Sequence, residues 1–294
     1  MIRVKKKLSV DWKMSKNIFN PNTSLTRYKA YLESLGLKKN TVDLYTHLVK
    51  TYLEDIGKDM PTSEEAADYH MALAQKKLSK TSMNNFAAAI TKYQTMLRKP
   101  VKLPFLKTNN ALPYYFDDID ILKLFSSCNN FKHLCMMKVL FFGCLRSGEL
   151  CNLDVQDYDP KNLTLRLNET KNGSDAIAYL NDEAAKMLNQ YLQVRPPLTI
   201  EDRDPLFFTD YGNRWTVKQV HKMFVSHKKA AGILKKGGVH CFSRHSSATL
   251  MIAQGCDLRT VQAILRHRDI NTTLRYTHLS DKTKREKYEH FMKL

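Results

Sequence analysis

The segment VHCFSRHS places two kinds of side chain that suit phosphate chemistry within six residues: His240, Arg244 and His245. An arginine can hold two phosphate oxygens through paired, charge-assisted hydrogen bonds, and it stays protonated. A histidine can exchange a proton near neutral pH. The segment therefore indicates chemistry on a phosphate group, unless it is a capped helix whose basic residues are incidental.

Arg146 stands in the segment GCLRSGEL, after an apolar helical stretch and close to a glycine that marks a break. An arginine at such a junction can project into a cleft, although a surface ion pair is the commoner role. Glu149 follows three residues later in the sequence. It either orients Arg146 or closes the packing of the next helix, and packing is the favoured interpretation.

Tyr276 lies in LRYTHLS, nine residues after His267, among basic residues where a core aromatic is unusual. A tyrosine hydroxyl has a pKa near ~10, so it needs nearby cations or a base to act as a nucleophile. Asp257 is predicted to cap a helix that ends near His267, and residues 271–273 to cap a short helix that carries Tyr276.

The spacing of apolar residues predicts the elements that position these side chains. Residues 163–169 and 176–180 alternate like strands around a turn at Asn172-Gly173, which predicts a hairpin. Helical spacing predicts helices at 117–126, 130–143, 182–193, 216–231, 243–254 and 258–266. The fold class that follows is mainly α with a small β-sheet (α+β).

The N-terminal third has helical periodicity only. The apolar spacing in residues 21–100 predicts four helices. The second is expected to be capped by Asn40 or Thr41, and the others to begin near Leu25, Pro61 and Ser79. Three prolines among basic and polar residues indicate a linker at 101–113. Residues 1–20 are predicted to form a basic arm, and residues 114–294 a second domain.

The composition points to a polyanionic partner. The chain of 294 residues has 47 Lys+Arg against 29 Asp+Glu, a net charge of +18, and nucleic acid is the commonest partner of such a chain. Its 43% hydrophobic content argues against global disorder. The absence of 18 consecutive apolar residues argues against a membrane span. The six cysteines lack metal-ligand spacing and are predicted to be reduced thiols, so no metal and no cofactor is expected.

The order of these motifs along the chain resembles that in the tyrosine recombinases, the integrase family of Xer-type and lambda-type enzymes. The resemblance covers about residues 115–285 by motif, and residues 20–100 by architecture only. It assigns six catalytic residues: Arg146 in LRSGEL, Lys171 before the Asn172-Gly173 turn, His240, Arg244, His267 in ILRH and Tyr276 in TTLRYTH.

The resemblance implies a reaction in which Tyr276 attacks a DNA phosphate and forms a 3′-phosphotyrosine, without ATP or metal. Arg146 and Arg244 would clamp the phosphate oxygens, and His267 would add a third donor. Relatives usually have the histidine three residues before the second arginine, as H-x-x-R. Here Cys241 has that position, and His240 stands four residues before Arg244. We expect an adjusted turn to bring His240 to the site as the base.

The remaining roles that the resemblance implies concern Lys171, the two domains and assembly. Lys171 would protonate the leaving 5′-hydroxyl. The helical 21–100 domain would be a core-binding domain that completes a clamp around duplex DNA. A C-terminal helix at about 281–294 would dock on a neighbouring protomer in a homo-tetramer on paired sites, formed from monomers in solution. Candidate DNA contacts are Lys38, Lys39, Thr41, Lys80, Ser82, Asn85 and Lys92.

Three functions stay open from the sequence. The first is a site-specific recombinase, either an integrase of a mobile element or a chromosome-dimer resolvase, located on DNA in the cytoplasm. The second is a nicking and closing enzyme like the type IB topoisomerases, which uses the same chemistry. The third is a DNA-binding regulator with a weakened site, for which the shifted His240 is the only support.

Overall fold

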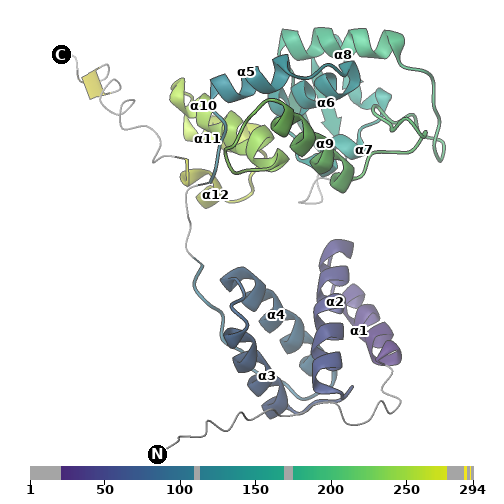
Figure 1. Ribbon diagram of the computed structural model, residues 1–294, viewed down its shortest axis with the longest axis vertical. Coiled ribbons are helices and arrows are strands. Elements are labelled where there is room, and N and C mark those ends of the chain that lie inside the picture. Colours follow the sequence, from purple (N-terminus) through teal and green to yellow (C-terminus); the bar gives the residue numbers. More distant parts are fainter. Residues whose placement is uncertain (1–20, 109–112, 169–174, 277–287, 290–291, 293–294) are drawn as a thin grey trace, which may run out of the picture. The chain divides into compact units, whose positions relative to one another are not determined.

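A computed structural model describes residues 21–108, 113–168, 175–276, 288–289 and 292 of the chain. The chain separates into two compact units, Met1–Asn109 and Asn110–Leu294 (Figure 1). The boundary between the units falls inside the 101–113 segment. The basic arm at 1–20, Lys171 and most of the C-terminal helix expected at 281–294 lie outside the described residues.

Within residues 21–108, the described part of the first unit, there are four helices: α1 (Asn22–Ser34), α2 (Lys39–Ile56), α3 (Ser63–Gln75) and α4 (Lys80–Met96). Its core is built around three fully buried tyrosines, Tyr28, Tyr52 and Tyr93. The rings of Tyr28 and Tyr93 meet edge to face, with their centroids 5.2 Å apart. The Tyr28 hydroxyl donates to the Ala89 carbonyl at 2.7 Å, so its burial leaves no unpaired donor.

Two of the helix starts in this unit follow the expected chemistry, and one does not. Thr62 and Glu65 form a reciprocal capping box at α3, and the Ser79 hydroxyl caps α4. The prediction that Asn40 or Thr41 caps α2 is wrong, because α2 begins at Lys39 and its N-cap residue makes no side-chain capping bond. The turn closes earlier because the Lys38 carbonyl accepts from the backbone N–H groups of residues 41 and 42.

The second unit is mostly helical with one small sheet, which confirms the predicted fold class. Its antiparallel sheet has the order β1-β2-β3, and β1 was not predicted. The elements are α5 (Asp118–Ser126), α6 (Phe131–Phe142), α7 (Ser147–Asn152), a 3₁₀ turn (Val155–Asp157), β1 (Tyr158–Asp159), β2 (Thr164–Leu167), β3 (Ala176–Tyr179), α8 (Asp182–Val194), α9 (Val217–Ala230), a π-helix η2 (Cys241–Ser246), α10 (Ser247–Ala253), α11 (Leu258–Ile264) and α12 (Asn271–Leu274).

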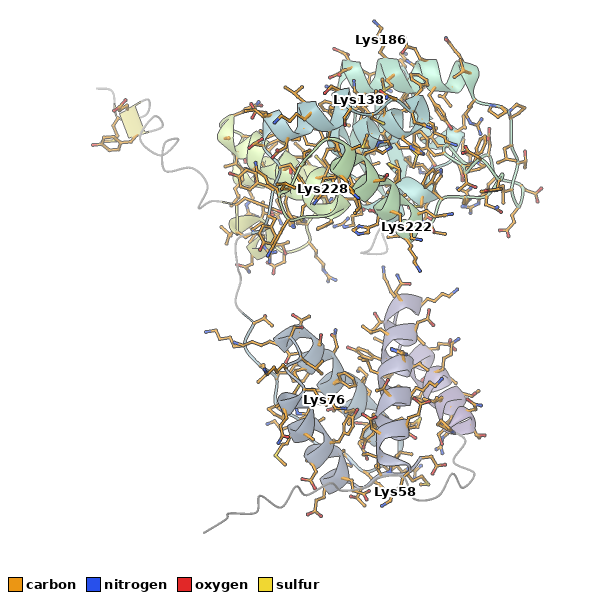
Figure 2. The ribbon with its side chains drawn as sticks, in the orientation of Figure 1. Lys58, Lys76, Lys138, Lys186, Lys222 and Lys228 are labelled. Atoms are coloured by element: carbon orange, nitrogen blue, oxygen red, sulfur yellow. The ribbon has the colours of Figure 1, made fainter. Side chains whose placement is uncertain are left out.

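Helix α6 is the central element of this unit. It packs against α8, and Lys138 of α6 pairs with Glu183 at the start of α8 (Figure 2). On another side, the fully buried Phe242 ring contacts Phe141 of α6 and Phe224 of α9. Because Phe242 belongs to the π-helix, this packing fixes the turn that carries Arg244.

The six cysteines are free thiols, as predicted, and four of them are buried. Burial raises the pKa of Cys135 and of Cys151 to about 12, so both stay protonated at neutral pH. Among the helices of the described ranges, none is long and apolar enough to cross a membrane.

Candidate active site

Arg244 is the most deeply buried charged residue of the predicted site, with 1% of its surface exposed. Its guanidinium donates to two main-chain carbonyls, those of Cys144, at 2.9 Å, and Leu265. Leu265 is the C-cap residue of α11, and Cys144 is the second residue after α6, so both carbonyls lie near the negative ends of helix dipoles. Burial lowers the pKa of Arg244 to about 10, with smaller contributions from Arg146 and Arg266, so it remains a cation at neutral pH.

Both of those helix ends have the same construction. After α6, Cys144 has a φ of +47°, and the N–H of Leu145 bonds back to the Leu140 carbonyl. After α11, Arg266 has a φ of +55°, and the N–H of His267 bonds back to the Gln262 carbonyl. This pattern is the Schellman motif, whose left-handed position is usually a glycine. In this chain a cysteine and an arginine occupy that position instead.

Arg146 stands at the N-cap position of α7 and is oriented by Glu149. The carboxylate accepts from the backbone N–H of Arg146 at 2.8 Å and from its Nη1 at 2.5 Å. Burial raises the pKa of Glu149, but the charge of Arg266 and the bonds from Arg146 outweigh it and leave the pKa below its usual value. Glu149 therefore orients Arg146 and, because its carboxylate also caps the first turn of α7, closes that helix as well.

Tyr276 is 1% exposed, and its hydroxyl hydrogen-bonds Nδ1 of His245 at 2.5 Å. Burial raises the pKa of Tyr276, while the charges of Arg244 and Arg275 lower it. Burial lowers the pKa of His245 to about 4, so its imidazole is neutral and able to accept a proton. The prediction that α12 carries Tyr276 is wrong, because α12 ends at Leu274 and residues 271–273 do not cap it.

The π-helix absorbs the extra residue between His240 and Arg244. A π-helix bonds residue i to i+5, so one turn holds more residues than an α-turn does. The rings of His240 and His245, five residues apart, are 4.9 Å between centroids and nearly perpendicular. The adjusted turn that we expected is therefore present, and it sets the His240 ring edge to face against the histidine that bonds Tyr276.

His267 follows the end of α11, whose N-terminus is capped by Asp257 as predicted. Its Nδ1 lies 2.9 Å from the hydroxyl of the buried Thr273, which fixes the plane of the ring. Burial lowers the pKa of His267 to about 3, with Arg244 and Arg146 adding to the effect. A neutral imidazole donates only one N–H, so the free enzyme presents a single donor here.

The stability of the protein should fall as the pH drops below about 6.5, the ordinary histidine pKa. His245 and His267 stay neutral in the folded chain down to about 4 and 3, so the unfolded chain binds more protons in that window. Each such histidine lowers the free energy of unfolding by at most ~1.4 kcal/mol per pH unit. Melting temperatures are measured by calorimetry between pH 7.5 and 5. The melting temperature of His267→Gln should fall less steeply with decreasing pH than that of the wild type. Parallel curves for variant and wild type would contradict the assignment.

Sequence reasoning missed two residues of this cluster. His245 was named only as part of the VHCFSRHS cluster and was given no catalytic role, yet it bonds Tyr276 directly. Arg266 was not singled out, yet its Nη2 lies 3.1 Å from Glu149 and 2.8 Å from the Cys144 carbonyl. The sequence signal for Arg266 was a charged residue at a helix end where a glycine is usual.

The structure gathers five of the six predicted catalytic residues in one place: Arg146, His240, Arg244, His267 and Tyr276. The sixth, Lys171, lies outside the described residues, between β2 and β3 in the sequence. The candidate DNA contacts lie on the first unit at the start of α2 and along α4, where their side chains are exposed or half-buried.

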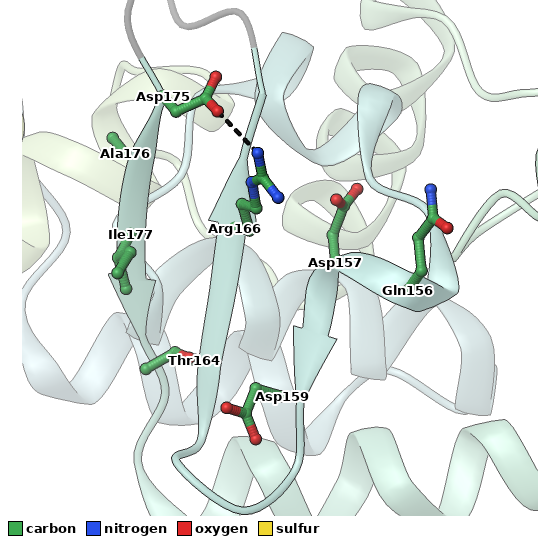
Figure 3. A pocket seen from close by; sticks show the side chains of 8 residues that line it. All are labelled: Gln156, Asp157, Asp159, Thr164, Arg166, Asp175, Ala176 and Ile177. Carbon is green, nitrogen blue, oxygen red and sulfur yellow. Dashed lines mark hydrogen bonds and ion pairs between the residues drawn. The ribbon is translucent and has the colours of Figure 1, made fainter.

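A surface cavity of about 500 Å³ lies over the sheet. Figure 3 shows the side chains of β2 and β3 around it, with Arg166 paired to Asp175 at 3.0 Å. None of the five predicted catalytic residues that the structure describes lines this cavity. Within the described ranges, no group of three or more His, Cys, Asp or Glu could hold a metal ion.

Residues 115–283 match the phage integrase family, and the chain belongs to that family. It is a tyrosine recombinase of the Xer and integrase type. Tyrosine recombinase XerA of Saccharolobus solfataricus is 27% identical over 286 residues, which cover 90% of this chain and 92% of XerA.

Two solved structures extend the likeness to the whole fold. A crystal structure of XerA recombinase has a TM-score of 0.55 at 29% identity and covers 94% of this chain and 100% of its own. The Tn1549 transposon integrase, solved in complex with transposon right end DNA, has a TM-score of 0.71 at 20% identity, over 92% and 99% of the two chains. The second match supports the shared fold alone.

Proposed function

We propose that the protein recombines DNA at specific sites by cutting and rejoining strands through a covalent bond to Tyr276. The Tyr276 oxygen attacks the phosphorus and the bond to the 5′ oxygen breaks, which leaves a 3′-phosphotyrosine and a free 5′-hydroxyl. A second 5′-hydroxyl attacks the phosphotyrosine and releases Tyr276. Each step exchanges one phosphoester bond for another, so the reaction needs no ATP.

The observation that carries the proposal is the hydroxyl of Tyr276 beside a neutral histidine and a buried arginine. His245 bonds the hydroxyl in the free enzyme, and the His240 ring meets the His245 ring edge to face. His245 is the imidazole in contact with the hydroxyl, and His240 is the one that the resemblance assigns as the base. Burial raises the pKa of that hydroxyl, and the charge of Arg244 opposes the rise.

The arginines supply the electrostatic part of the proposed reaction. The transition state of phosphoryl transfer spreads negative charge over the phosphate oxygens, so positioned cations lower its free energy. Among the described residues, Arg146 and Arg266 bond the carboxylate of Glu149, and the guanidinium of Arg244 lies close enough to be influenced by the same charge. Three cationic groups thus stand beside this one carboxylate. The excess positive charge suits a phosphate. We assign protonation of the leaving 5′ oxygen to Lys171, as the family motif implies.

We propose that the first unit binds duplex DNA through the basic and polar side chains of α2 and α4 named above, and that four copies assemble on paired sites. The net charge of +18 supports a DNA partner. The transposon integrase of the same fold was solved with transposon DNA.

A covalent adduct tests the proposal. Full-length protein is incubated with nicked suicide duplexes taken from the DNA that flanks its gene, then digested with trypsin and analysed by mass spectrometry. We expect a nucleotide adduct on the peptide Tyr276–Lys282. Adducts on another residue, or tight binding without any adduct on a duplex that the protein protects from nuclease, would overturn it and favour a DNA-binding regulator.

The topology of the products separates recombination from simple nicking and closing. Paired sites on one supercoiled plasmid should be deleted or inverted by a recombinase. Relaxation of the plasmid without any exchange between the sites would instead indicate an activity like that of the type IB topoisomerases.

A further inference from the structure

Arg266 occupies a backbone position that costs free energy for any residue with a side chain. It is the left-handed residue of the Schellman motif after α11, with a φ of +55°. Glycine is favoured there because it has no Cβ to clash. Strained residues persist where the surrounding structure over-determines them, and they cluster at functional sites. The arginine side chain must therefore make contacts that offset the strain.

Those contacts join the two arginines of the proposed phosphate clamp. Nη2 of Arg266 donates to the Glu149 carboxylate at 3.1 Å, and Glu149 in turn accepts from Arg146. The same Nη2 donates at 2.8 Å to the Cys144 carbonyl, which also accepts from Arg244 at 2.9 Å. Arg266 thus shares one acceptor with each catalytic arginine.

The ion pair between Arg266 and Glu149 is buried, which strengthens its effect on the site. The side chains of Arg266 and Glu149 are 9% and 7% exposed. Of the influences that lower the pKa of Glu149, the charge of Arg266 is the largest. Without Arg266, the Glu149 carboxylate would retain the hydrogen bonds from half-buried Arg146. The Cys144 carbonyl would retain the bond from Arg244.

We propose that Arg266 is a positioning residue that sets the geometry of Arg146 and Arg244 toward the phosphate. This inference rests on the proposed function, because it assigns Arg266 to the strand-cleavage step. Arg266 acts through Glu149 and the Cys144 carbonyl rather than by touching the DNA. A displacement of about 1 Å in a catalytic group can cost roughly 100-fold in rate, so its loss should affect the rate more than binding.

The decisive variant is Arg266→Gly, because glycine adopts this backbone without strain and removes only the side chain. Single-turnover cleavage of a suicide duplex is measured against protein concentration, which separates the maximal rate from the half-saturating concentration. We expect the maximal rate to fall about 10- to 100-fold, with half-saturation within about threefold of wild type. Added guanidinium at millimolar concentration should restore part of the rate.

A double-mutant cycle with Glu149→Gln tests whether Arg266 influences the cleavage rate through Glu149. If Arg266 acts through Glu149, the maximal cleavage rate of the double variant should be little lower than that of the slower single variant. Both substitutions remove the same Arg266–Glu149 contact. Arg259→Gln is the matched control, since it removes an exposed guanidinium from α11, the helix whose end Arg266 follows. It should cleave at the wild-type rate.

Three results would overturn the inference. The first is a folded Arg266→Gly protein that cleaves within about threefold of the wild-type rate. The second is a raised half-saturating concentration with an unchanged maximal rate, which would make Arg266 a DNA contact. The third is full additivity with Glu149→Gln. If Arg266→Gly does not melt cooperatively, Arg266→Lys is judged by the same measurements. Failure of wild type to form any adduct would count against the proposed function instead.

Discussion

Tyr276→Phe should abolish covalent attachment to DNA while leaving the affinity for the duplex within about threefold of wild type. Phenylalanine keeps the ring in its buried position but removes the hydroxyl that we propose as the nucleophile. Tyr276 is 1% exposed, so most of its packing is retained in the variant. Gel mobility under native and denaturing conditions separates binding from covalent attachment.

The same variant should also melt at a lower temperature. His245 Nδ1 loses its 2.5 Å partner in a half-buried setting, and an unsatisfied buried polar group costs ~1–3 kcal/mol. A domain of this size loses ~2–4 °C per kcal/mol, so a fall of several degrees is expected. Tyr211→Phe is the matched control, because its side chain is 92% exposed. Residual adduct formation by Tyr276→Phe would remove Tyr276 as the nucleophile.

Arg244→Lys should reduce the rate of strand cleavage by roughly 10²- to 10³-fold, the usual cost of losing one donor to a transition-state oxyanion. The guanidinium bonds two carbonyls and still has N–H groups left for a phosphate. A lysine ammonium is a single point donor, so it cannot reproduce that fork. Single-turnover cleavage rates provide the measurement.

Arg244→Lys also leaves at least one of the two buried carbonyls without a charged donor, so the melting temperature should fall with the rate. Arg259→Lys serves as the control, because Arg259 is exposed on α11 and should tolerate the change. An Arg244→Lys enzyme that cleaves within about threefold of wild type would show that Arg244 supports the fold and does not act on the phosphate.

The apolar periodicity predicted most of the secondary structure of the second unit to within a residue or two. The segments 117–126 and 130–143, for example, became α5 at 118–126 and α6 at 131–142. Helix α5 buries one face, with Ile121 and Leu124, so its periodicity was clear. Helix α6 is buried on most sides, and its length and apolar composition marked it instead. The two-residue strand β1 was too short to show an alternating pattern.

The contacts within the site could not be predicted, because they join residues far apart in the sequence. His245 and Tyr276 are 31 residues apart, and Glu149 and Arg266 are 117 apart. A spacing of four residues between His240 and Arg244 is also ordinary α-helical spacing, so the π-turn left no local signal. Only the difference from the H-x-x-R motif indicated that this turn was unusual.

The anchoring of Arg244 by main-chain carbonyls has a consequence for evolutionary drift. Every residue type carries a carbonyl, so positions 144 and 265 can change identity without losing the acceptors that orient the guanidinium. What selection must preserve is the point where the ends of α6 and α11 meet. The geometry of such a site can therefore outlast most of its sequence, in keeping with a shared fold at 20% identity.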